Sequence, residues 1–586
     1  MEKKKKGNKS TNRGLVIFTC LALLLAIGLG AVVYLPKLLS KNNGEDPVDV
    51  IITDTPAPQV TDQSGTPIVV TAIPSLDPQQ TESTVVASGK GIVSCSNPLA
   101  SAIGAQILDQ GGNAVDAIVA IAFALGVLEP YASGIGGGGC AMVYDPVSGA
   151  SMCFDYRDAA GDFVFSSSYG KTGVPGFVLG METLSQKYGT MSWGSLIQPS
   201  IEYAENGFAI SASFARHLQS SRSKLSSKKD PQFYNGSNLL VEGDIVYQSE
   251  LAETYRLIQR YGSTIFYHGA ITEHMISALS NKLTAEDFSS YTVRERKPVQ
   301  GTFRDYTIVS APAPFSGTTL IQMLNIADAV DLTSYDEDVV RYAKLMANIA
   351  SVTLKDRRKN ICDPDYHPVA SNLLTEAHIS ALIEKVKTGS PEYIEPDDEH
   401  ESTTHIAVID GNGMMVTMTN TLSDFFGYGV YVDGFFMNNT LTTTSSDPSA
   451  RNYCIKGQRP RSFAMPTFIF GPDGFKMALG SSGGDRIPQV VTQILLRFFN
   501  GEDLQEACDR PRLYLNGYEY RIEDTSVIDP NNLLPGADFY KRAFPTREFF
   551  GAFNAVYIKD GVMSGASDGR RYGGIATSEG DDLPDS

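Results

Sequence analysis

The hydrophobic and polar positions along the chain first predict a membrane anchor near the N-terminus. Residues 14–35 form a run of 22 without a charged side chain, and at about 1.5 Å per residue such a helix crosses the hydrocarbon core. Six Lys or Arg residues precede the run, which keeps that end in the cytoplasm. We therefore predict a basic cytoplasmic tail at 1–13 and a single transmembrane signal anchor at 14–36 in the cell membrane, with the rest of the chain extracellular. A cleaved signal peptide is the alternative.

The next segment, residues 37–84, has a different composition. It is rich in Thr, Pro, Asp and Gln and contains few large aromatic residues. Such a segment cannot bury enough apolar surface to fold, so we predict a disordered linker. From about Val85 the chain has a globular pattern to its end, without an internal repeat of roughly 20–50 residues.

Beyond the linker, the pattern predicts helices and strands together. Residues 96–130 are typical of two helices separated by Gly111 and Gly112, and the second is apolar enough to be buried. The short runs HIAVID, MMVTMTNT, TFIFG and FKMALG are typical of strands. Because these runs do not alternate regularly with helices, the pattern favours a layered α+β fold over a doubly wound parallel sheet.

One predicted strand begins in an unusual way. Residues 395–410, EPDDEHESTTHIAVID, pass from five acidic residues through Thr403 and Thr404 into an apolar alternation, with no Gly or Pro at the junction. One interpretation is a strand end in which Thr serves its β propensity. The other is that a peptide bond breaks there and frees an N-terminal threonine, whose hydroxyl can be activated by its own α-amine without a histidine.

Three further features carry weaker signals. Residues 134–139 match G-x-G-x-x-G but follow a helix, so a tight backbone crossing with positive φ is a better interpretation than a nucleotide site. Gly483 and Gly484 follow a strand-like run, and adjacent amides can stabilise an oxyanion, although most such pairs are turns. His405 alternates onto the face of Thr403, and we interpret it as structural rather than as a base.

Charge and cysteine spacing argue against several classes of function. The formal net charge is −18; residues 1–41 hold eight basic residues and one acid, so the remainder has 40 basic and 65 acidic residues and a charge of −25. This acidic surface disfavours nucleic acid as a partner. The seven cysteines lie at no metal-like spacing and form no C-x-x-C, so we expect neither a metal site nor any other cofactor.

Taken together, a series of motifs resembles the γ-glutamyltransferase (γ-glutamyl transpeptidase) family. They follow the family's order over nearly the whole globular part: GGNAVDA (111–117), LEPYASGIGGGG (128–139), GVPGF (173–177), KYGTMSWGSLIQPSIEYAENGFAIS (187–211), APAPFSGTTLIQMLNI (311–326), DPDY, TTH, RPRSFAMPT, GSSGGDR and GASDGRRYGG. One of these motifs alone would be weak, but so many in one order form a specific pattern.

The resemblance implies an N-terminal-nucleophile hydrolase fold, which is a four-layer αββα sandwich. It also implies that the precursor cleaves itself between Ser402 and Thr403. The catalytic domain would then consist of a large chain, 85–402, and a small chain, 403–586, that stay associated. On this interpretation the acidic run is the end of the large chain.

The same resemblance assigns the catalytic groups. Thr403 would be the nucleophile that forms a γ-glutamyl-enzyme intermediate, and Thr421 would be the threonine that hydrogen-bonds it. Gly483 and Gly484 match the oxyanion hole. Water or an amine would accept the γ-glutamyl group.

The donor site is only partly retained. Arg157 in DYRDAA matches the arginine that binds the donor's α-carboxylate, and a guanidinium suits this role because it pairs bidentately with carboxylate. Ser462 matches a hydroxyl on the same carboxylate, whereas Phe463 replaces a second serine and adds bulk. Ser423 matches a donor-binding position that is usually asparagine.

The site for the donor's α-ammonium departs further from the family. Thr442 and Thr443 stand where the family normally has an acidic pair, so this group loses its counter-charge. Asp424 and Asp447 are the acidic residues nearby in sequence. The segment 440–459 is also shorter than in members with a lid, which would open the cleft to longer substrates.

Three functions follow from this pattern. The first is an autoprocessing γ-glutamyl amide hydrolase or transferase that acts outside the cytoplasm on glutathione or related compounds. The second is a poly-γ-glutamate depolymerase or another amide acylase of the same family, which suits the missing acidic pair. The third, of another class, is a non-catalytic surface binding protein with a degenerate pocket.

Overall fold

The computed structural model describes most of the chain beyond the predicted linker, and all described residues belong to one unit, Val60–Ser586. The described residues are 86–87, 90–162, 170–332, 338–393, 402–517, 519–523, 541–543 and 547–578. The predicted tail, transmembrane helix and linker lie outside them, as do residues 394–401 of the acidic run. Within the described part, no helix combines the length and the apolar character needed to cross a membrane.

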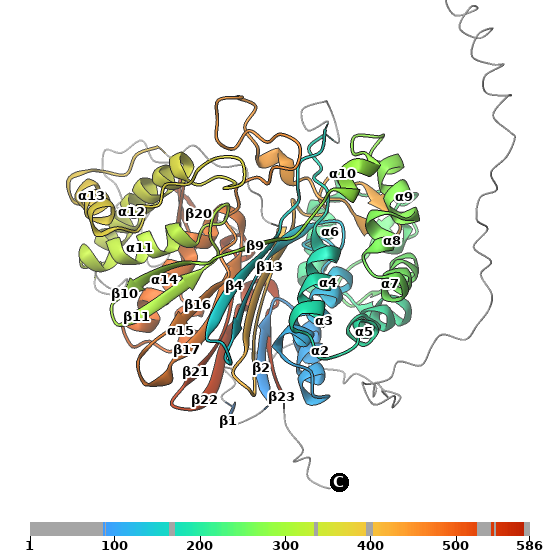
Figure 1. Cartoon of the computed structure of the whole chain (residues 1–586), viewed down its shortest axis with the longest axis horizontal. Helices are drawn as coiled ribbons and strands as arrows, with labels where there is room; N and C mark the ends of the chain where they lie inside the picture. The colour runs from blue at the N-terminus through green and yellow to red at the C-terminus, as the bar shows by residue number, and fades with distance from the viewer. Residues whose placement is uncertain are drawn as a thin grey trace, which may run out of the picture. The chain divides into compact units, whose positions relative to one another are not determined.

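Two antiparallel seven-stranded sheets form the centre of this unit (Figure 1). The first sheet has the order β23 (Gly574–Ser578), β2 (Gly91–Cys95), β12 (Ser402–Asp410), β13 (Met415–Ser423), β3 (Gly138–Asp145), β4 (Ala150–Tyr156) and β9 (Arg294–Arg296). The second has the order β1 (Val86–Ala87), β22 (Val562–Ser567), β21 (Ala552–Lys559), β17 (Lys476–Ser482), β16 (Thr467–Phe470), β11 (Tyr306–Ser310) and β10 (Val299–Phe303).

Helices cover the outer face of each sheet (Figure 1). Those on the side of the first sheet are α2 (Pro98–Asp109), α3 (Ala114–Leu128), α4 (Phe177–Tyr188), α5 (Trp193–Asn206), α6 (Ala212–Ser220), α7 (Ser249–Tyr261), α8 (Thr264–Tyr267), α9 (Ala270–Ala278) and α10 (Ala285–Ser289). Those on the side of the second are α11 (Gly317–Ala329), α12 (Val339–Asn360), α13 (Glu376–Thr388), α14 (Ile487–Phe499) and α15 (Leu504–Asp509).

Strand β12 shows how the layers are held together. Ile406 and Val408 belong to the hydrophobic core shared with the helices, whereas Ala407 and Ile409 belong to the core between the two sheets. Successive side chains of a strand point to opposite faces, so a strand buried on both faces needs an apolar residue at nearly every position. The layered α+β arrangement predicted from the sequence is therefore confirmed.

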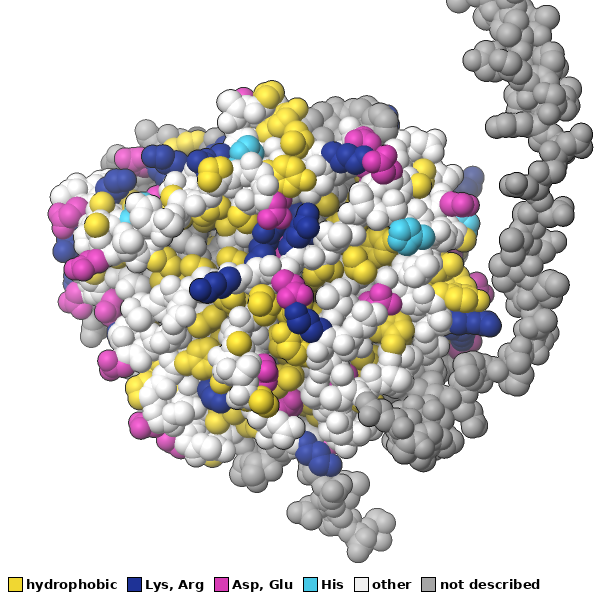
Figure 2. All heavy atoms as spheres, in the orientation of Figure 1, with side chains coloured by type: hydrophobic (Ala, Val, Ile, Leu, Met, Phe, Trp, Pro, Cys, Tyr) yellow, Lys and Arg dark blue, Asp and Glu magenta, His cyan; other side chains and the backbone are white. Residues whose placement is uncertain are grey.

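Short strands lie outside the two sheets. They are β5 (Phe208–Ala209) with β8 (Ile245–Val246), β6 (Tyr234–Asn235) with β7 (Asn238–Leu239), β14 (Tyr431–Val432) with β15 (Phe435–Phe436), and a small sheet of β18 (Leu513–Asn516), β19 (Glu519–Ile522) and β20 (Lys541–Ala543). On the face drawn in Figure 2, acidic and basic side chains lie interspersed with hydrophobic ones. The six cysteines of the described part are buried and form no disulfide bond.

The two helices predicted within 96–130 are confirmed as α2 and α3, and they are separated at residues 111–112 as expected. Asn97 caps the first of them through its side chain, and Asn113 forms a capping box with Asp116 at the start of the second. Every residue of α3 is buried, in agreement with its apolar composition. The four predicted apolar runs are likewise confirmed as β12, β13, β16 and β17.

Candidate active site

Thr403 lies at an irregularity near the start of β12. The pairing with β13 shifts by one residue between Ser402 and Thr404, so that Thr403 faces two residues, Thr421 and Leu422. Such a bulge re-aims a side chain locally. Thr403 is 7% exposed, and its position is therefore set by the pairing of two buried strands.

Two hydroxyl groups meet at the carbonyl oxygen of Ser402. Thr403 Oγ1 donates a hydrogen bond to this oxygen at 2.7 Å, and Thr421 Oγ1 donates to the same atom. The structure thus brings the predicted nucleophile and its predicted partner together at the bond that is predicted to break. A donor on the carbonyl oxygen stabilises the negative charge that would develop there during attack.

The loop 129–137, between α3 and β3, holds this strand end in place. Ser402 Oγ donates to the carbonyl of Ala132 at 2.7 Å. Thr404 Oγ1 donates to Ser133 Oγ at 3.0 Å. The residues on both sides of Thr403 are therefore tied to the same loop, which limits how far the hydroxyl of Thr403 can move.

The glycine-rich end of this loop crosses other backbone at very short range. A Cβ atom at Gly136 would lie 2.0 Å from the carbonyl oxygen of Phe436, and one at Gly137 would lie 2.3 Å from that of Thr421. Only Gly134, with φ of +139°, has the positive φ that was predicted for this motif. The tight crossing is confirmed, and its main cause is close backbone approach.

Glu129 is a buried carboxyl group in the same loop. Burial raises its pKa to about 8, although a hydrogen bond from Ser96 and the charge of Arg571 act in the opposite direction. Ser96 Oγ donates to Glu129 Oε2 at 2.9 Å. The carboxyl group is therefore largely protonated at neutral pH.

His405 lies between the two sheets. Its Nδ1 is 2.9 Å from Thr419 Oγ1 and its Nε2 is 2.9 Å from Thr417 Oγ1. Burial lowers its pKa to about 3, and a Cβ atom at Gly480 would lie 2.2 Å from its ring. The interpretation as a structural histidine is confirmed because both ring nitrogens are engaged within the sandwich.

Gly483 and Gly484 form the turn at the end of β17. Their φ values are +125° and +59°, in the region that favours glycine. Gly480, three residues before the turn, packs on the ring of His405, which is two residues after Thr403. The turn therefore lies towards the same end of the sandwich as Thr403, where the resemblance requires an oxyanion hole.

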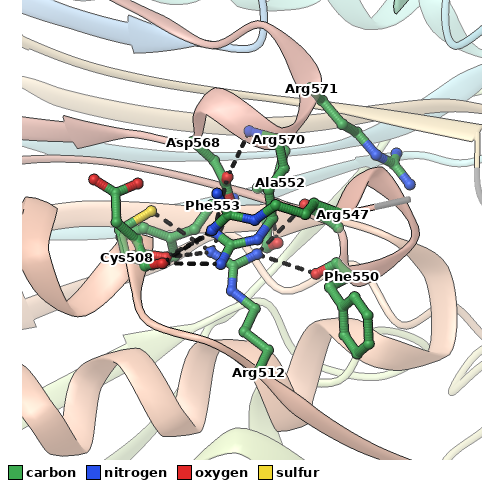
Figure 3. Close-up of polar contacts among 12 residues, drawn as sticks. Cys508, Arg512, Arg547, Phe550, Ala552, Phe553, Asp568, Arg570 and Arg571 are labelled. Carbon is green, nitrogen blue, oxygen red and sulfur yellow. Dashed lines mark hydrogen bonds and ion pairs between the residues drawn. The ribbon is translucent and has the colours of Figure 1, made fainter. Parts of the chain in front are cut away.

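A cluster of buried arginine side chains lies beside the segment 550–553 (Figure 3). Gly551 of this segment packs against the glycine turn, since a Cβ atom at Gly483 would lie 3.0 Å from Gly551 Cα. Arg512 Nη1 donates to the carbonyl of the preceding Phe550 at 3.1 Å, and its Nη2 pairs with Asp568 at 2.5 Å. These contacts fix the chain against which the glycine turn rests.

Asp568 is the centre of charge in this cluster. Burial would raise its pKa, but the charges of Arg512 and Arg570 outweigh burial and lower the pKa to about 2. The neighbouring Arg571 donates to Ser482 Oγ at 3.3 Å, directly before the turn. The motif GASDGRRYGG carried the family resemblance, yet the sequence alone assigned no role to these residues.

Arg157 bonds the backbone that leads directly to Ser462. Arg157, which is 1% exposed, donates through Nε to the carbonyl of Pro460 at 3.0 Å and through Nη2 to that of Arg461 at 3.1 Å. Ser462 follows directly in sequence. Its Oγ accepts from the amide of Ala464 at 3.1 Å, which limits the rotation of this side chain.

Phe463 lies in the hydrophobic core of the second sheet. The guanidinium of the buried Arg357 lies over its ring, 3.6 Å from the centroid. Arg357 Nε in turn donates to Ser316 Oγ, which donates to the carbonyl of Ser462. The sequence suggested that the Phe463 ring adds bulk to the donor site. The ring instead packs in the hydrophobic core against Arg357.

The threonines that replace the acidic pair complete their own turn. Residues Thr440–Thr443 form a short 3-10 helix, in which Thr442 Oγ1 donates to the carbonyl of Asn439 at 2.7 Å and Thr443 Oγ1 to that of Thr440 at 2.9 Å. Ser423, at the end of β13, is buried with φ of +80°. These groups supply hydroxyl oxygens but no charge.

The two acidic residues nearby in sequence have partners of their own. Asp424 accepts from Asn439 Nδ2 at 2.8 Å and lies 3.4 Å from Lys224 Nζ. Asp447 is exposed and accepts from Ser449 within its own turn. Both carboxylates are therefore engaged in local structure.

Comparison with known proteins places these features in a family. The model of the gamma-glutamyltranspeptidase family matches residues 100–578. The chain is 36% identical over 487 residues to the capsule biosynthesis protein CapD proenzyme of Bacillus anthracis, covering 82% of this chain and 89% of that protein. It is 33% identical over 537 residues to the glutathione hydrolase proenzyme of Bacillus subtilis (strain 168), covering 82% and 90%.

A solved structure shows the same fold. The cephalosporin acylase from Bacillus halodurans superimposes with a TM-score of 0.76 at 24% identity, over 86% of this chain and 99% of that protein. The family match extends over most of the chain and the two relatives are similar along nearly their whole length. The resemblance inferred from the motifs is thereby confirmed, and the chain belongs to the gamma-glutamyltranspeptidase family of enzymes.

Proposed function

We propose that this enzyme cleaves its own chain between Ser402 and Thr403 and then uses Thr403 as an N-terminal nucleophile on γ-glutamyl amides. The observation that carries the proposal is the pair of hydroxyls, from Thr403 and Thr421, on the carbonyl oxygen of Ser402. The proenzyme names of the two relatives support the same conclusion.

Self-cleavage begins with an attack by Thr403 Oγ1 on the carbonyl carbon of Ser402. The C–N bond breaks, the hydroxyl proton passes to the departing amine, and an ester joins Ser402 to the side chain of Thr403. Water then hydrolyses the ester and leaves a carboxylate on Ser402 and a free α-amine on Thr403. Thr421 stabilises the oxyanion of this step through the bond it already makes.

The mature reaction repeats this chemistry on the donor. The α-amine of Thr403 takes the hydroxyl proton while Oγ1 attacks the γ-carbonyl carbon, and the leaving amine departs with a proton. The amides of Gly483 and Gly484 would hold the oxyanion, and Arg157 with Ser462 would bind the donor's α-carboxylate. Water or an amine then releases the γ-glutamyl group.

We place this activity outside the cytoplasm. The support is the uncharged run at 14–35 with basic residues before it, which is typical of an anchor with its N-terminus inside. The large chain 85–402 and the small chain 403–586 would stay associated, since β12 of the small chain pairs with β2 of the large chain.

A second candidate is a depolymerase that acts on poly-γ-glutamate or on another long amide. The absence of a carboxylate at Thr442 and Thr443 favours it, because the α-amine of an internal residue in such a polymer is acylated and carries no charge. The similarity to a capsule biosynthesis protein points in the same direction. Turnover of a γ-glutamyl anilide compared with that of the polymer separates the two candidates.

The proposal is tested by a denaturing gel with N-terminal sequencing of the purified full-length chain. We expect two bands, with the smaller beginning Thr403-Thr404-His405, and a single uncleaved band for Thr403→Ala. Thr403→Ser is the matched control and should still be cleaved. A single band for the wild-type chain would contradict the proposal and support a non-catalytic binding protein.

A further inference from the structure

The carboxyl group of Asp158, next to Arg157, is buried and only half satisfied. Its Oδ2 accepts a hydrogen bond of 2.6 Å from Thr440 Oγ1, whereas its Oδ1 has no hydrogen-bond partner among the described residues. Burial raises the pKa of Asp158 to about 7, against the hydrogen bond from Thr440 and the charge of Arg157. A buried acceptor without a donor is costly, so such an atom calls for an explanation.

The free oxygen lies close to the catalytic groups. A Cβ atom at Gly138 would lie 2.9 Å from Asp158 Oδ1, so this oxygen occupies the space beside that glycine. Gly138 pairs with Thr421 on the neighbouring strand, and paired strands lie about 4.8 Å apart. Asp158 is thus one strand away from the hydroxyl that bonds the carbonyl of Ser402.

A second oxygen without a hydrogen-bond partner in the described part of the chain belongs to Ser423, two residues after Thr421. Ser423 is 2% exposed and its Oγ also has no hydrogen-bond partner among the described residues. The amide of Asn439 donates to the carbonyl of Leu422 at 3.1 Å, and the next residue, Thr440, bonds Asp158. Residues 439–440 therefore contact both the residue before Ser423 and the carboxyl group of Asp158.

Two oxygens of this kind suit a primary ammonium group, which has three N–H donors and no acceptor. The nearest alternatives in sequence are engaged, because Asp424 pairs with Lys224 and Asp447 bonds Ser449. Asp158 combines burial, a free oxygen and a position next to the residue assigned to the donor's α-carboxylate.

We propose that Asp158, together with Ser423, binds the α-ammonium group of the γ-glutamyl donor. The inference rests on the proposed function. It assigns the counter-charge that Thr442 and Thr443 lack to the residue that follows Arg157, so that adjacent side chains of opposite charge bind the two charged groups of the same α-carbon. The preferred substrates are then γ-glutamyl compounds with a free α-amine, and N-acylated donors are disfavoured.

The test is a comparison of two donors with Asp158→Asn, which keeps an acceptor for Thr440 but removes the charge. With L-γ-glutamyl anilide we expect KM to rise about 10–100-fold, as for the loss of one charge-assisted hydrogen bond, with kcat changed less than about threefold. With N-acetyl-γ-glutamyl anilide, KM should stay within about threefold of the wild-type value. Asp447→Asn makes the same change at an exposed carboxyl group and is the control. It should leave KM for both donors unchanged.

Two results would overturn the inference. If KM rose equally for both donors, Asp158 would have a structural role and would not bind the ammonium group. If KM were unchanged for both donors, Asp158 would not contact the donor. Complete self-cleavage on a gel, together with turnover of the acetylated donor, shows that the variant is folded.

A binding measurement separates this inference from the proposed function. L-glutamate has no γ-amide to cleave, so its binding is measured by calorimetry on the wild-type chain and on Asp158→Asn, and N-acetyl-L-glutamate serves as the comparison. We expect Kd for L-glutamate to rise about 10–100-fold with Asp158→Asn. If the wild-type chain turns over neither anilide, this loss would still support the ammonium site while the proposed reaction fails. Equal binding to both proteins would refute the site.

Discussion

The two walls of the active site are built from different chemistry. One side, which carries Thr403 and is called the neutral wall below, is held by hydroxyl groups that donate to backbone carbonyls, as in the bond from Ser402 Oγ to Ala132. The other side, which carries the turn at Gly483 and is called the charged wall, is held by buried ion pairs around Asp568. Neutral donors position reacting groups without perturbing their charge, whereas a turn with two positive φ values needs a rigid support. The two walls should therefore respond differently to substitution and to pH.

The largest expected effect is on the charged wall. Asp568→Asn removes the counter-charge of the buried Arg512, whereas Arg570 keeps its ion pair with Glu523. The free energy of unfolding should fall by about 3–5 kcal/mol at pH 7, because an uncompensated buried charge remains. Chemical denaturation measures this change. Because the pKa of Asp568 falls from 3.8 to about 2 on folding, its contribution is present above pH 3.8 and disappears as the pH falls towards 2.

The matched control for that experiment is Asp509→Asn, at an exposed residue of α15. It should change the free energy of unfolding by no more than about 0.5 kcal/mol. If Asp568→Asn were equally mild, the ion pairs would not support the glycine turn, and the contrast between the walls would be lost.

The neutral wall is tested by Thr421→Val, which removes one hydroxyl from the carbonyl of Ser402 and keeps the volume of the side chain. Self-cleavage should slow about 10²–10³-fold, as is typical for loss of one oxyanion donor, and a time course on a denaturing gel measures it. Thr442→Val removes a hydroxyl that serves only its own turn, and it should cleave at the wild-type rate. If Thr421→Val were cleaved at the wild-type rate, groups other than the Thr421 hydroxyl would stabilise the oxyanion of this step.

Much of the fold was predictable because burial on both faces leaves a clear pattern. The run HIAVID places alternate residues in two cores. Residues 111–112 divide two helices, of which the second is apolar at nearly every position and buried throughout. The family resemblance paired Thr403 with Thr421, and their hydroxyls meet at the carbonyl oxygen of Ser402. It also paired Arg157 with Ser462, and Arg157 bonds the carbonyl of the preceding Arg461. These two pairings came from motifs known together in a family, not from local sequence.

The rest depends on contacts between distant parts of the chain. The bulge at Thr403 exists only in the pairing of β12 with β13. Arg512 and Asp568 are 56 residues apart, and Asp158 and Thr440 are 282 apart. Whether a carboxylate is paired, half satisfied or exposed follows from such contacts, so its local sequence does not reveal it.

Glu129 tests the comparison through pH, since it lies in the loop of the neutral wall yet senses the charge of Arg571. Its pKa rises from 4.5 in the unfolded chain to about 8 in the fold, so its contribution is fully present below pH 4.5 and is lost as the pH rises towards 8. The free energy of unfolding of Glu129→Gln should therefore rise by about 3 kcal/mol, relative to that of the wild type, between pH 4.5 and pH 7. Chemical denaturation of both proteins at the two pH values measures this change. The same difference between the two proteins at both pH values would contradict the prediction.

The smallest expected effect concerns the tie between Ser402 and the loop. Ser402→Ala removes a hydroxyl that bonds the carbonyls of Tyr131 and Ala132, while both donors on the Ser402 carbonyl remain. Loss of one neutral hydrogen bond corresponds to about 1 kcal/mol, so self-cleavage should slow only about fivefold in the gel assay. Ser148→Ala, in an exposed turn, is the control. A loss as large as that of Thr421→Val would mean that holding the strand end matters as much as stabilising the oxyanion, and that the neutral wall depends on rigid support as fully as the charged one.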